Sequence, residues 1–336
     1  MVNRQFVLAA RPEGMIRETD FRLVESNVPP VREGEMLVRA RYLSVDPYMR
    51  GRMSAARSYA PSVDIGQVMT GGGVGEVVES RITSGNTKFN TGDIVNFQMG
   101  WQEYAISNGE NVRKVDPSLA PISTAVGILG MPGLTAYYGV TEICAVKAGE
   151  TVVVSGAAGA VGSAAGQIAS IRGAHVVGIT GGPKKVDYIL RELGFHDAID
   201  YKANPDIAAA LRDTCPHRVD AYFDNVGGTT TDAVLAYLNT FARVGLCGQI
   251  SQANDSAPPS GPRIYRDVLV ARARVQGFLI WDFTRQEEAL VDLASWIAAG
   301  DLKYREDILE GFENMPKALI GLFLGENIGK RVVRVA

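Results

Sequence analysis

The sequence predicts an α/β protein with a β-rich first part and a doubly wound parallel sheet in its second part. Short apolar runs separated by Gly, Pro, Asn and Ser fill the first 125 or so residues, without long helical patterns between them. From Thr151 onward, strand-like and helix-like segments alternate. A glycine-rich turn joins the first of these strands to the first helix, which is typical of βαβ units.

The composition fits a globular protein of about two domains, at roughly 100–200 residues per domain. The chain has 336 residues, of which 46% are hydrophobic and 21% charged, and its formal net charge is −3. Lysines and arginines are scattered, so we expect neither nucleic acid nor a membrane as a partner. Thr151–Ile171 is long enough to span a bilayer, but Gly156 and Gly159 divide it into strand, turn and helix.

The sequence has features of an intracellular protein. The apolar start Phe6–Ala10 is short and is followed by Arg11 and Pro12, so it does not resemble a secretory signal. Three cysteines cannot form a disulfide framework and are typical of a reducing compartment. We therefore expect a cytoplasmic protein.

The first part of the chain is expected to form an antiparallel, partly closed β unit. Its expected strands are Phe6–Ala10, Glu35–Leu43, Val74–Glu79, Asp93–Phe97 and Glu103–Ile106. The second part is expected to form a parallel sheet. Its expected strands are Thr151–Ser155, Ala174–Ile179, Asp197–Asp200, Val219–Asp224, Arg243–Ile250 and Arg274–Trp281, with helices at Val161–Arg172, Lys184–Leu193, Pro205–Thr214 and Thr229–Thr240.

The end of the chain departs from this alternation. Ser251–Gly261 is rich in Gly, Pro and Ser and is long enough to form a mobile loop over a site. Two helices are expected near Gln286–Ala299 and Asn314–Leu324, followed by a closing strand at Arg331–Val335.

The glycine turn Gly156–Gly162 has the spacing GxxGxxG, a variant of the dinucleotide-binding fingerprint of Rossmann domains. The first glycine permits a tight turn, the middle one lets the backbone approach a pyrophosphate, and the last allows close helix–strand packing. The following helix offers unpaired N–H groups to phosphates. The alternative is a Gly/Ala turn inside an ordinary α/β sheet.

The end of the second strand favours NADPH over NADH. An NAD site needs an acidic residue there to accept a hydrogen bond from the ribose 2′-hydroxyl. Here the strand Ala174–Ile179 is followed by Thr180, Gly181 and the lysine pair Lys184 and Lys185, with no carboxylate. Lysines accommodate a 2′-phosphate, although they could also form only a solvated start of the next helix.

Two further turns follow strands of the predicted sheet, at the edge where ligands of doubly wound folds bind. Asp224–Gly228 ends one strand, and Cys247, Gly248 and Gln249 lie at the end of the next. Both are therefore expected to line the nicotinamide half of the cofactor, unless they serve only as turns.

Several motifs together resemble the zinc-independent branch of the medium-chain dehydrogenase/reductases. This branch includes leukotriene/prostaglandin reductases, plant alkenal double-bond reductases and bacterial curcumin reductases. The resemblance covers nearly the whole chain, and Ser58–Gly66 is most similar to the curcumin reductase-like members. The motifs are Val45–Arg52, Gly130–Tyr137, Gly156–Gly162, Asp224–Gly228, Glu310–Pro316 and Gly325–Lys330.

This resemblance implies a GroES-like β-rich catalytic domain in residues 1–125 and a Rossmann NADPH-binding domain in residues 126–300. Residues 301–336 would return to the catalytic domain, and the protein would be a homodimer. The implied cofactor-binding residues are Ala158, Gly159, Ala160, Val161 and Gly162 at the pyrophosphate, Thr180, Gly181, Lys185 and Tyr201 at the adenosine end, and Asn225, Cys247, Gly248, Gln249, Ser251, Phe278, Leu279, Ile280 and Asn327 along the remainder.

The implied reaction is reduction of the carbon–carbon double bond of an α,β-unsaturated ketone or aldehyde by hydride transfer from NADPH to the β-carbon. Negative charge then builds on the carbonyl oxygen and needs a hydrogen-bond donor. Zinc-dependent relatives hold their metal with Cys and His of the first domain. The first cysteine here is Cys144 and the first histidine is His175, so no metal is expected.

The identity of the donor is open, because many relatives carry a tyrosine where this chain has Val270. Tyr265 lies five residues earlier, and on a helix this is a rotation of about 500°, roughly 140° from the original face. Tyr48 and Tyr59 are therefore favoured over Tyr265, and a ribose hydroxyl or water could also serve. Arg50 and Trp101 are expected to line the substrate pocket, although Trp101 could equally be a core aromatic.

Two other functions remain compatible with these residues. One is an NADPH-dependent quinone reductase of the same superfamily. The other is a protein that binds the cofactor without catalysis, which the Val270 position leaves open.

Overall fold

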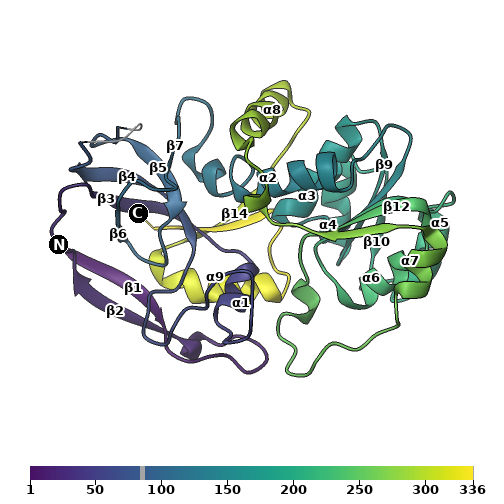
Figure 1. The fold of residues 1–336 in the computed structure, drawn as a ribbon, viewed down its shortest axis with the longest axis horizontal. Coiled ribbons are helices and arrows are strands. Elements are labelled where there is room, and N and C mark those ends of the chain that lie inside the picture. Colours follow the sequence, from purple (N-terminus) through teal and green to yellow (C-terminus); the bar gives the residue numbers. More distant parts are fainter. Residues whose placement is uncertain (84–87, 336) are drawn as a thin grey trace. The chain divides into compact units, whose positions relative to one another are not determined.

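The computed structural model describes residues 1–83 and 88–335, which form two compact units (Figure 1). Unit 1 comprises Met1–Gly127, Glu306–Asn327 and Arg331–Ala336, and unit 2 comprises Ile128–Arg305 and Ile328–Lys330. The return to unit 1 thus begins at Glu306, where residue 301 was expected. Three residues of the last segment, Ile328–Lys330, belong to unit 2.

Unit 1 is built on antiparallel strands. A hairpin of β1 and β2 accompanies a seven-stranded sheet in the order β14-β15-β3-β4-β5-β7, with β6 paired to β3. The strands are β1 Val2–Leu8, β2 Phe21–Asn27, β3 Met36–Ser44, β4 Gly72–Ser80, β5 Ile94–Gln98, β6 Tyr104–Ser107, β7 Arg113–Lys114, β14 Glu306–Glu310 and β15 Lys330–Arg334. The helices are α1 Tyr48–Arg52 and α9 Met315–Phe323, with 3₁₀ turns η1 Glu18–Asp20, η2 Ile122–Val126 and η7 Phe312–Asn314.

The sequence predicted six of these strands and missed β2, β7 and β14. Only one side chain of β2, Phe21, is buried, so this strand has no alternating apolar pattern. It is held by its register with β1, in which Leu8 is opposite Phe21.

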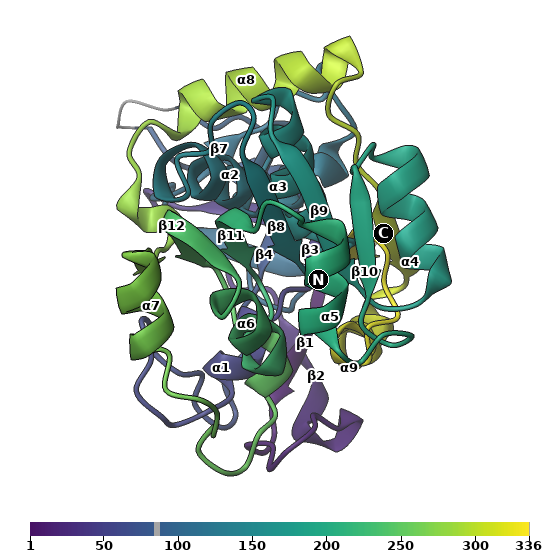
Figure 2. The same cartoon turned by 90° about the vertical axis from the view of Figure 1, so that its right-hand side faces the viewer.

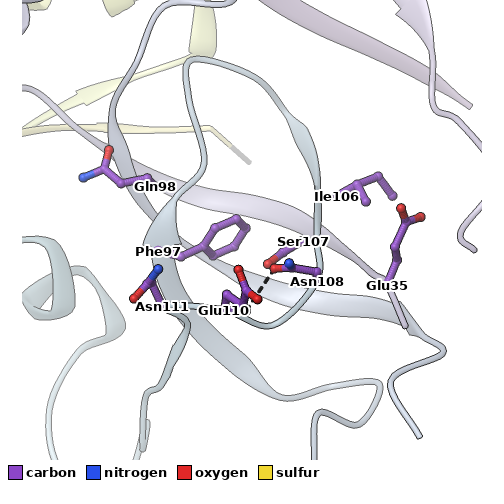
Figure 3. Close-up of a pocket in the computed structure, with 8 residues that line it drawn as sticks. All are labelled: Glu35, Phe97, Gln98, Ile106, Ser107, Asn108, Glu110 and Asn111. Carbon is purple, nitrogen blue, oxygen red and sulfur yellow. Dashed lines mark hydrogen bonds between the residues drawn. The ribbon is translucent and has the colours of Figure 1, made fainter. Parts of the chain in front are cut away.

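Unit 1 carries a surface groove of about 500 Å³ where β5 and β6 meet the loop that follows β6 (Figure 3). Its lining includes the carboxylates of Glu35 and Glu110 but no basic side chain. The groove is therefore unsuited to a phosphate. Of its lining residues, Gln98 alone also contacts a residue predicted for the reaction, Tyr48.

Unit 2 contains the predicted parallel sheet, in the order β10-β9-β8-β11-β12-β13. Renumbered along the chain, this is the 3-2-1-4-5-6 order of Rossmann domains. The strands are β8 Thr151–Ser155, β9 His175–Thr180, β10 Asp197–Asp200, β11 Val219–Asp224, β12 Leu238–Leu246 and β13 Arg274–Gly277. The helices are α2 Met131–Tyr138, α3 Ala160–Ile171, α4 Pro183–Asp187, α5 Ile207–Thr214, α6 Gly228–Leu235, α7 Tyr265–Ala271 and α8 Gln286–Ala299, with π-helical turns η3 Gly139–Ile143 and η4 Tyr188–Glu192 and 3₁₀ turns η5 Ile250–Gln252 and η6 Ile280–Asp282.

Both faces of this sheet are buried, which explains the unbroken apolar run of β8. Val152 and Val154 pack on one face with α2 and α3, whereas Val153 packs on the other face with α5, α6 and α7. Figure 2 shows these helices on either side of the strands. Of the residues the structure describes, no helix is long and apolar enough to cross a membrane.

Several boundaries predicted from the sequence were wrong: the strands expected to end at Ile250 and Trp281 end at Leu246 and Gly277. The expected helix Thr229–Thr240 ends at Leu235, and β12 begins at Leu238 instead of at Arg243. The strand is irregular there: Phe241 has a positive φ of 66°, and the register with β11 shifts. Such a bulge interrupts the alternating pattern on which the sequence-based boundary rested.

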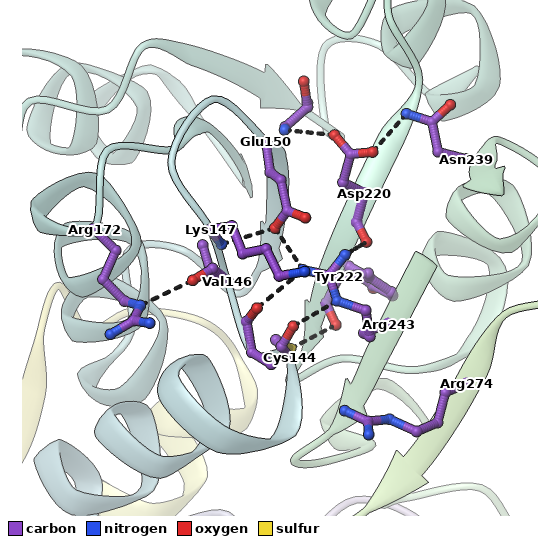
Figure 4. A network of polar contacts seen from close by, with 12 residues as sticks. Cys144, Val146, Lys147, Glu150, Arg172, Asp220, Tyr222, Asn239, Arg243 and Arg274 are labelled. Atoms are coloured by element: carbon purple, nitrogen blue, oxygen red, sulfur yellow. Dashed lines mark hydrogen bonds and ion pairs between the residues drawn. The ribbon is translucent and has the colours of Figure 1, made fainter. Parts of the chain in front are cut away.

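A polar network fixes the amino ends of the central strands (Figure 4). The guanidinium of Arg243 forms an ion pair with Glu150 and donates hydrogen bonds to the carbonyl oxygens of Cys144 and Asp220. Asp220 accepts from the backbone N–H of Thr151 at 2.9 Å. The network is remote along each strand from the carboxyl ends that carry the predicted binding turns.

A histidine pair at the start of β9 and β10 makes stability pH-dependent. The His196 Nδ1 accepts a hydrogen bond from the Val176 N–H at 3.1 Å, and its ring lies 4.6 Å from that of His175. Partial desolvation, with a smaller contribution from the charge of His175, lowers the pKa of His196, whereas Asp197 opposes this. A protonated ring also loses the acceptor that Nδ1 provides.

We expect acidification to destabilise the protein through His196. Because the folded state lowers this pKa, the unfolded chain binds the proton first, and stability is lost as pH falls below about 6.5. The effect is small because the ring is exposed. His196→Asn keeps an acceptor that does not titrate, so thermal melting between pH 7.5 and 5 should fall less steeply than in the wild type. Parallel melting curves for the two proteins would contradict this role.

Candidate functional site

The glycine turn has the backbone geometry of a phosphate site. Gly156 has a φ of +61°, and a Cβ on Gly162 would lie 2.3 Å from the Gly156 carbonyl oxygen. Helix α3 then starts at Ala160 with Gly159 as an extended N-cap, and no side chain caps it. The first backbone N–H groups of a helix lack intrahelical partners, so they are directed toward an anion. The turn therefore fits a pyrophosphate.

A segment from the end of the chain holds this turn in place. The Gly329 N–H donates to the Ala158 carbonyl oxygen at 2.8 Å, and Gly159 and Gly329 form an isolated parallel bridge. Gly329 has a φ of +74°, and a Cβ there would lie 2.1 Å from the Arg305 carbonyl oxygen. Sequence reasoning missed this role, although Gly329 lies within a motif that it did single out.

The corner beyond β9 is built around Gly181. A Cβ on this residue would lie 2.6 Å from Cζ of Tyr201, so the tyrosine ring packs closely over it. Thr180, at the end of β9, is buried. Lys184 and Lys185 follow in the first turn of α4. The corner therefore presents a ring and two cations where the sequence predicted an adenosine 2′-phosphate.

Asp200 is a carboxylate at this corner that the sequence analysis missed. Its Oδ1 accepts hydrogen bonds from the N–H groups of Gly182 at 2.8 Å and Lys202 at 3.0 Å. Desolvation acts to raise its pKa, but these backbone hydrogen bonds outweigh it and the pKa is lowered. Asp200 thus stays ionised and holds the turn that precedes the lysines.

The buried carboxylate of Asp224 organises the other predicted binding turn. Its side chain accepts hydrogen bonds from the hydroxyls of Ser155, Tyr222 and Thr231. Its backbone carbonyl accepts from the N–H groups of Cys247 and Gly248 at 2.8 and 3.0 Å. Asp224 is only 1% exposed, so it is a structural group and does not contact solvent.

The residues around Asp224 lie at the carboxyl ends of β8, β11 and β12, as predicted. Asn225 donates its amide to the Ser155 carbonyl oxygen at 2.7 Å, and Ser251 donates its hydroxyl to Val226. Cys247 as a residue is partly exposed, but its thiol is desolvated, which raises the pKa of the thiol to about 12. The thiol is therefore no nucleophile at neutral pH.

The three predicted cofactor contacts that follow β13 differ in exposure: Phe278 is buried, whereas Leu279 and Ile280 are partly exposed. The Phe278 ring is buried in the core, 6.1 Å from the ring of Phe223, so its side chain does not face a ligand. Asn327 is buried and belongs to unit 1. Its contact with a cofactor stays a prediction.

In unit 1, two of the predicted tyrosines lie on either side of one arginine. The Tyr48 hydroxyl donates to Oε1 of Gln98 at 3.4 Å, and the guanidinium carbon of Arg52 lies 5.8 Å from the Tyr48 ring centre. The same carbon lies 4.9 Å from the ring centre of Tyr59, which is 53% exposed. Burial is the main cause of a raised pKa at Tyr48, so this phenol keeps its proton at neutral pH.

Arg50 and Trp101, which were predicted to line the substrate pocket, are both buried in unit 1, and their pocket roles stay predictions. Arg50 is 7% exposed, and its Nη2 donates to the carbonyl oxygens of Pro12 and Gly14, so it anchors the N-terminal segment. Trp101 is fully buried and stacks on Phe21 at 5.0 Å, which fits the core alternative for this residue.

Tyr265 and Val270 both lie on α7, which supports the rotation argument from the sequence. They are 76% and 69% exposed. Among residues 1–83 and 88–335, no three or more His, Cys, Asp or Glu side chains are grouped so as to hold a metal ion.

The fold and these two groups of residues define a two-domain dinucleotide-binding protein. Two known families match it in turn. The family described as "N-terminal domain of oxidoreductase" matches residues 4–115, and the family described as "Zinc-binding dehydrogenase" matches residues 160–296.

Relatives match over almost the whole chain. The NADPH-dependent curcumin reductase of Escherichia coli is 44% identical, covering 99% of this chain and 97% of the relative. Prostaglandin reductase 1 of Rattus norvegicus is 43% identical, covering 96% of each. The crystal structure of CurA from Vibrio vulnificus in complex with NADPH is 45% identical, with a TM-score of 0.93 and 99% coverage of both chains. The chain belongs to the zinc-independent branch of the medium-chain dehydrogenase/reductases, which confirms the resemblance seen in the sequence.

We expect Lys185→Ala to raise the dissociation constant for NADPH by about tenfold or more, and that for NADH much less, because only NADPH carries the 2′-phosphate. An exposed charge pair contributes little, but several contacts on one phosphate add up. Lys184→Ala is the matched control, since Lys184 is the more exposed neighbour in the same turn. Dissociation constants for both cofactors with all three proteins test this, and equal losses for NADPH and NADH would contradict a phosphate contact.

Proposed function

We propose that this protein catalyses the NADPH-dependent reduction of the carbon–carbon double bond of α,β-unsaturated ketones and aldehydes. The observation that carries the proposal is similarity above 40% identity, over nearly the full chain, to relatives named curcumin reductase and prostaglandin reductase. The phosphate-binding turn of unit 2 and the phenols of unit 1 supply the groups that such a reaction needs.

NADPH supplies the hydride for the β-carbon when it is bound. The chain's own residues bind the cofactor and orient it. The N–H groups that open α3 bind the pyrophosphate, Lys185 contacts the 2′-phosphate, and Tyr201 packs at the adenosine end. Asp224 holds Val226 and Cys247, and Ser155 holds Asn225, in fixed positions along the remainder of the cofactor.

Tyr48 is the group we propose to bond the carbonyl oxygen of the substrate. Its hydroxyl donates to the amide oxygen of Gln98 at the long distance of 3.4 Å, so it can exchange this weak bond for a substrate oxygen. Because the pKa of Tyr48 is raised, the hydroxyl donates at any physiological pH. Tyr59 is the second candidate, and its exposure leaves it accessible.

We expect Tyr48→Phe to lower kcat and kcat/KM for an enone together, on the order of 100-fold, because the lost donor acts mainly on the transition state. The KM for NADPH should change little. Tyr59→Phe should have a smaller effect, and Tyr265→Phe is the control on the exposed helix α7. Full activity of both Tyr48→Phe and Tyr59→Phe would mean that a ribose hydroxyl or water binds the oxygen.

The reaction itself is tested with the wild-type protein. NADPH oxidation is followed with an aryl enone, an alkenal and a quinone, and the product is identified by mass spectrometry as the saturated carbonyl compound. Turnover of the quinone alone would favour a quinone reductase. Binding of NADPH without turnover of any of the three would favour a protein that has lost catalysis.

We also propose a homodimer formed along the open edge of the unit 2 sheet. β13 is the last strand in the sheet order, and the adjacent helix α7 exposes Leu269 and Val270 by 75% and 69%. An open strand edge beside exposed apolar side chains is a surface that native proteins cover. A second copy of the chain would cover it. We further propose a cytoplasmic location, which the three free cysteines Cys144, Cys215 and Cys247 support.

We expect the double variant Leu269→Glu/Val270→Glu to be a monomer where the wild type is a dimer, because carboxylates would be desolvated in the contact. Val291→Glu is the matched control, since Val291 on α8 is equally exposed at 68%. Light scattering after size-exclusion chromatography measures the mass of each protein. A wild-type monomer, or a double variant that stays dimeric, would refute the edge contact.

A further inference from the structure

Arg52 lies at the centre of the phenol pair in unit 1. Arg52 is only 7% exposed, and its guanidinium carbon lies 5.8 Å from the Tyr48 ring centre and 4.9 Å from the Tyr59 ring centre. Tyr48 and Arg52 are four residues apart on α1, so they share one face of the helix. Arg52 thus contacts both phenols proposed to serve the reaction.

Arg52 also closes the loop that carries Tyr59. Its Nη1 donates to the Pro61 carbonyl oxygen at 3.3 Å, and its own carbonyl oxygen accepts from the Val63 N–H at 2.8 Å. The loop of residues 53–62 therefore leaves Arg52 and returns to it. In the middle of this loop, Arg57 and Tyr59 are exposed.

The charge of Arg52 has little compensation from the protein. Among the described residues, no carboxylate forms an ion pair with it, and one carbonyl oxygen and two aromatic rings are its partners. The charged and titratable groups facing Tyr48 are Asp46, Arg52 and Tyr59, and Arg52 alone favours negative charge there. A nearly buried cation without a paired carboxylate would stabilise negative charge that develops close by.

We propose that Arg52 is a positioning residue for the reduction: it holds the Tyr59 loop, orients the Tyr48 ring and places a positive charge beside the phenols that bond the substrate oxygen. This proposal rests on the proposed function for its kinetic part. Its structural part, the fixing of the loop, is tested independently of any activity.

The structural test is limited proteolysis. Arg57 provides a trypsin site inside the loop, and Arg57→Gln identifies the corresponding fragment because it removes that site. We expect Arg52→Gln to speed cleavage after Arg57 at least fivefold at a temperature well below melting. Arg50→Gln is the matched control, because Arg50 is equally buried on α1 but bonds Pro12 and Gly14. Its cleavage rate after Arg57 should stay within twofold of the wild type.

The kinetic test compares Arg52→Gln with Arg52→Lys. We expect Arg52→Gln to lower kcat for an enone at least tenfold while the dissociation constant for NADPH stays within twofold. Arg52→Lys keeps the charge but lacks the planar group that stacks on two rings. It should recover part of kcat and still show faster cleavage after Arg57. Melting curves and NADPH binding verify that each variant is folded.

Each outcome decides the proposal. Faster cleavage together with a fall in kcat supports it. Unchanged cleavage in Arg52→Gln would overturn it, whatever the activity, because the loop would then be held by other contacts. Faster cleavage with unchanged kcat would overturn the link to catalysis. If the wild-type protein reduces no enone, the proposed function fails, whereas the cleavage rates still decide whether Arg52 holds the loop.

Discussion

The binding edge of unit 2 depends on one buried carboxylate. Asp224 ends β11, and its oxygens accept hydrogen bonds from Ser155 on β8 and from Thr231 on α6. Its backbone carbonyl binds the segment that follows β12 through Cys247. A buried carboxylate without these donors would be strongly destabilising. The positions of three loops are therefore coupled. This coupling stabilises the sheet edge at the point where the strand order reverses, which is where doubly wound folds bind their ligands.

Local sequence was sufficient to predict the six strands of the unit 2 sheet and its phosphate turn, although it missed helices α2 and α7. The apolar run of β8, the glycines that follow it and the first turn of α3 are neighbours in the chain, so their geometry is encoded where they stand. The same holds for Tyr201, which follows β10 directly and packs on Gly181. The glycine turn and the lysines after β9 already indicated NADPH, whereas the reaction came only from the family resemblance.

Contacts between distant residues were beyond such reasoning. The sequence left Trp101 open between a pocket wall and a core aromatic, because its partner Phe21 lies 80 positions earlier, in a strand without an alternating apolar pattern. The bonds of Arg50 to Pro12 and Gly14 were not predicted, because their acceptors are backbone carbonyls, which have no side-chain signature. The bridge between Gly329 and Gly159 joins residues 170 positions apart. In each case the tertiary partner lies too far along the chain for a local pattern to identify it.

A comparison of Asp224 with Arg52 separates structural from functional buried charge. Asp224 is surrounded by hydroxyl and N–H donors, so its charge is neutralised by the fold and is not available to a ligand. Within residues 1–83 and 88–335, Arg52 has one carbonyl acceptor and two aromatic rings as partners, which is fewer acceptors than its five N–H groups could use. Because Val270 cannot donate a hydrogen bond, we propose that Tyr48 supplies the proton donor for the substrate oxygen and that Arg52 places a positive charge beside it.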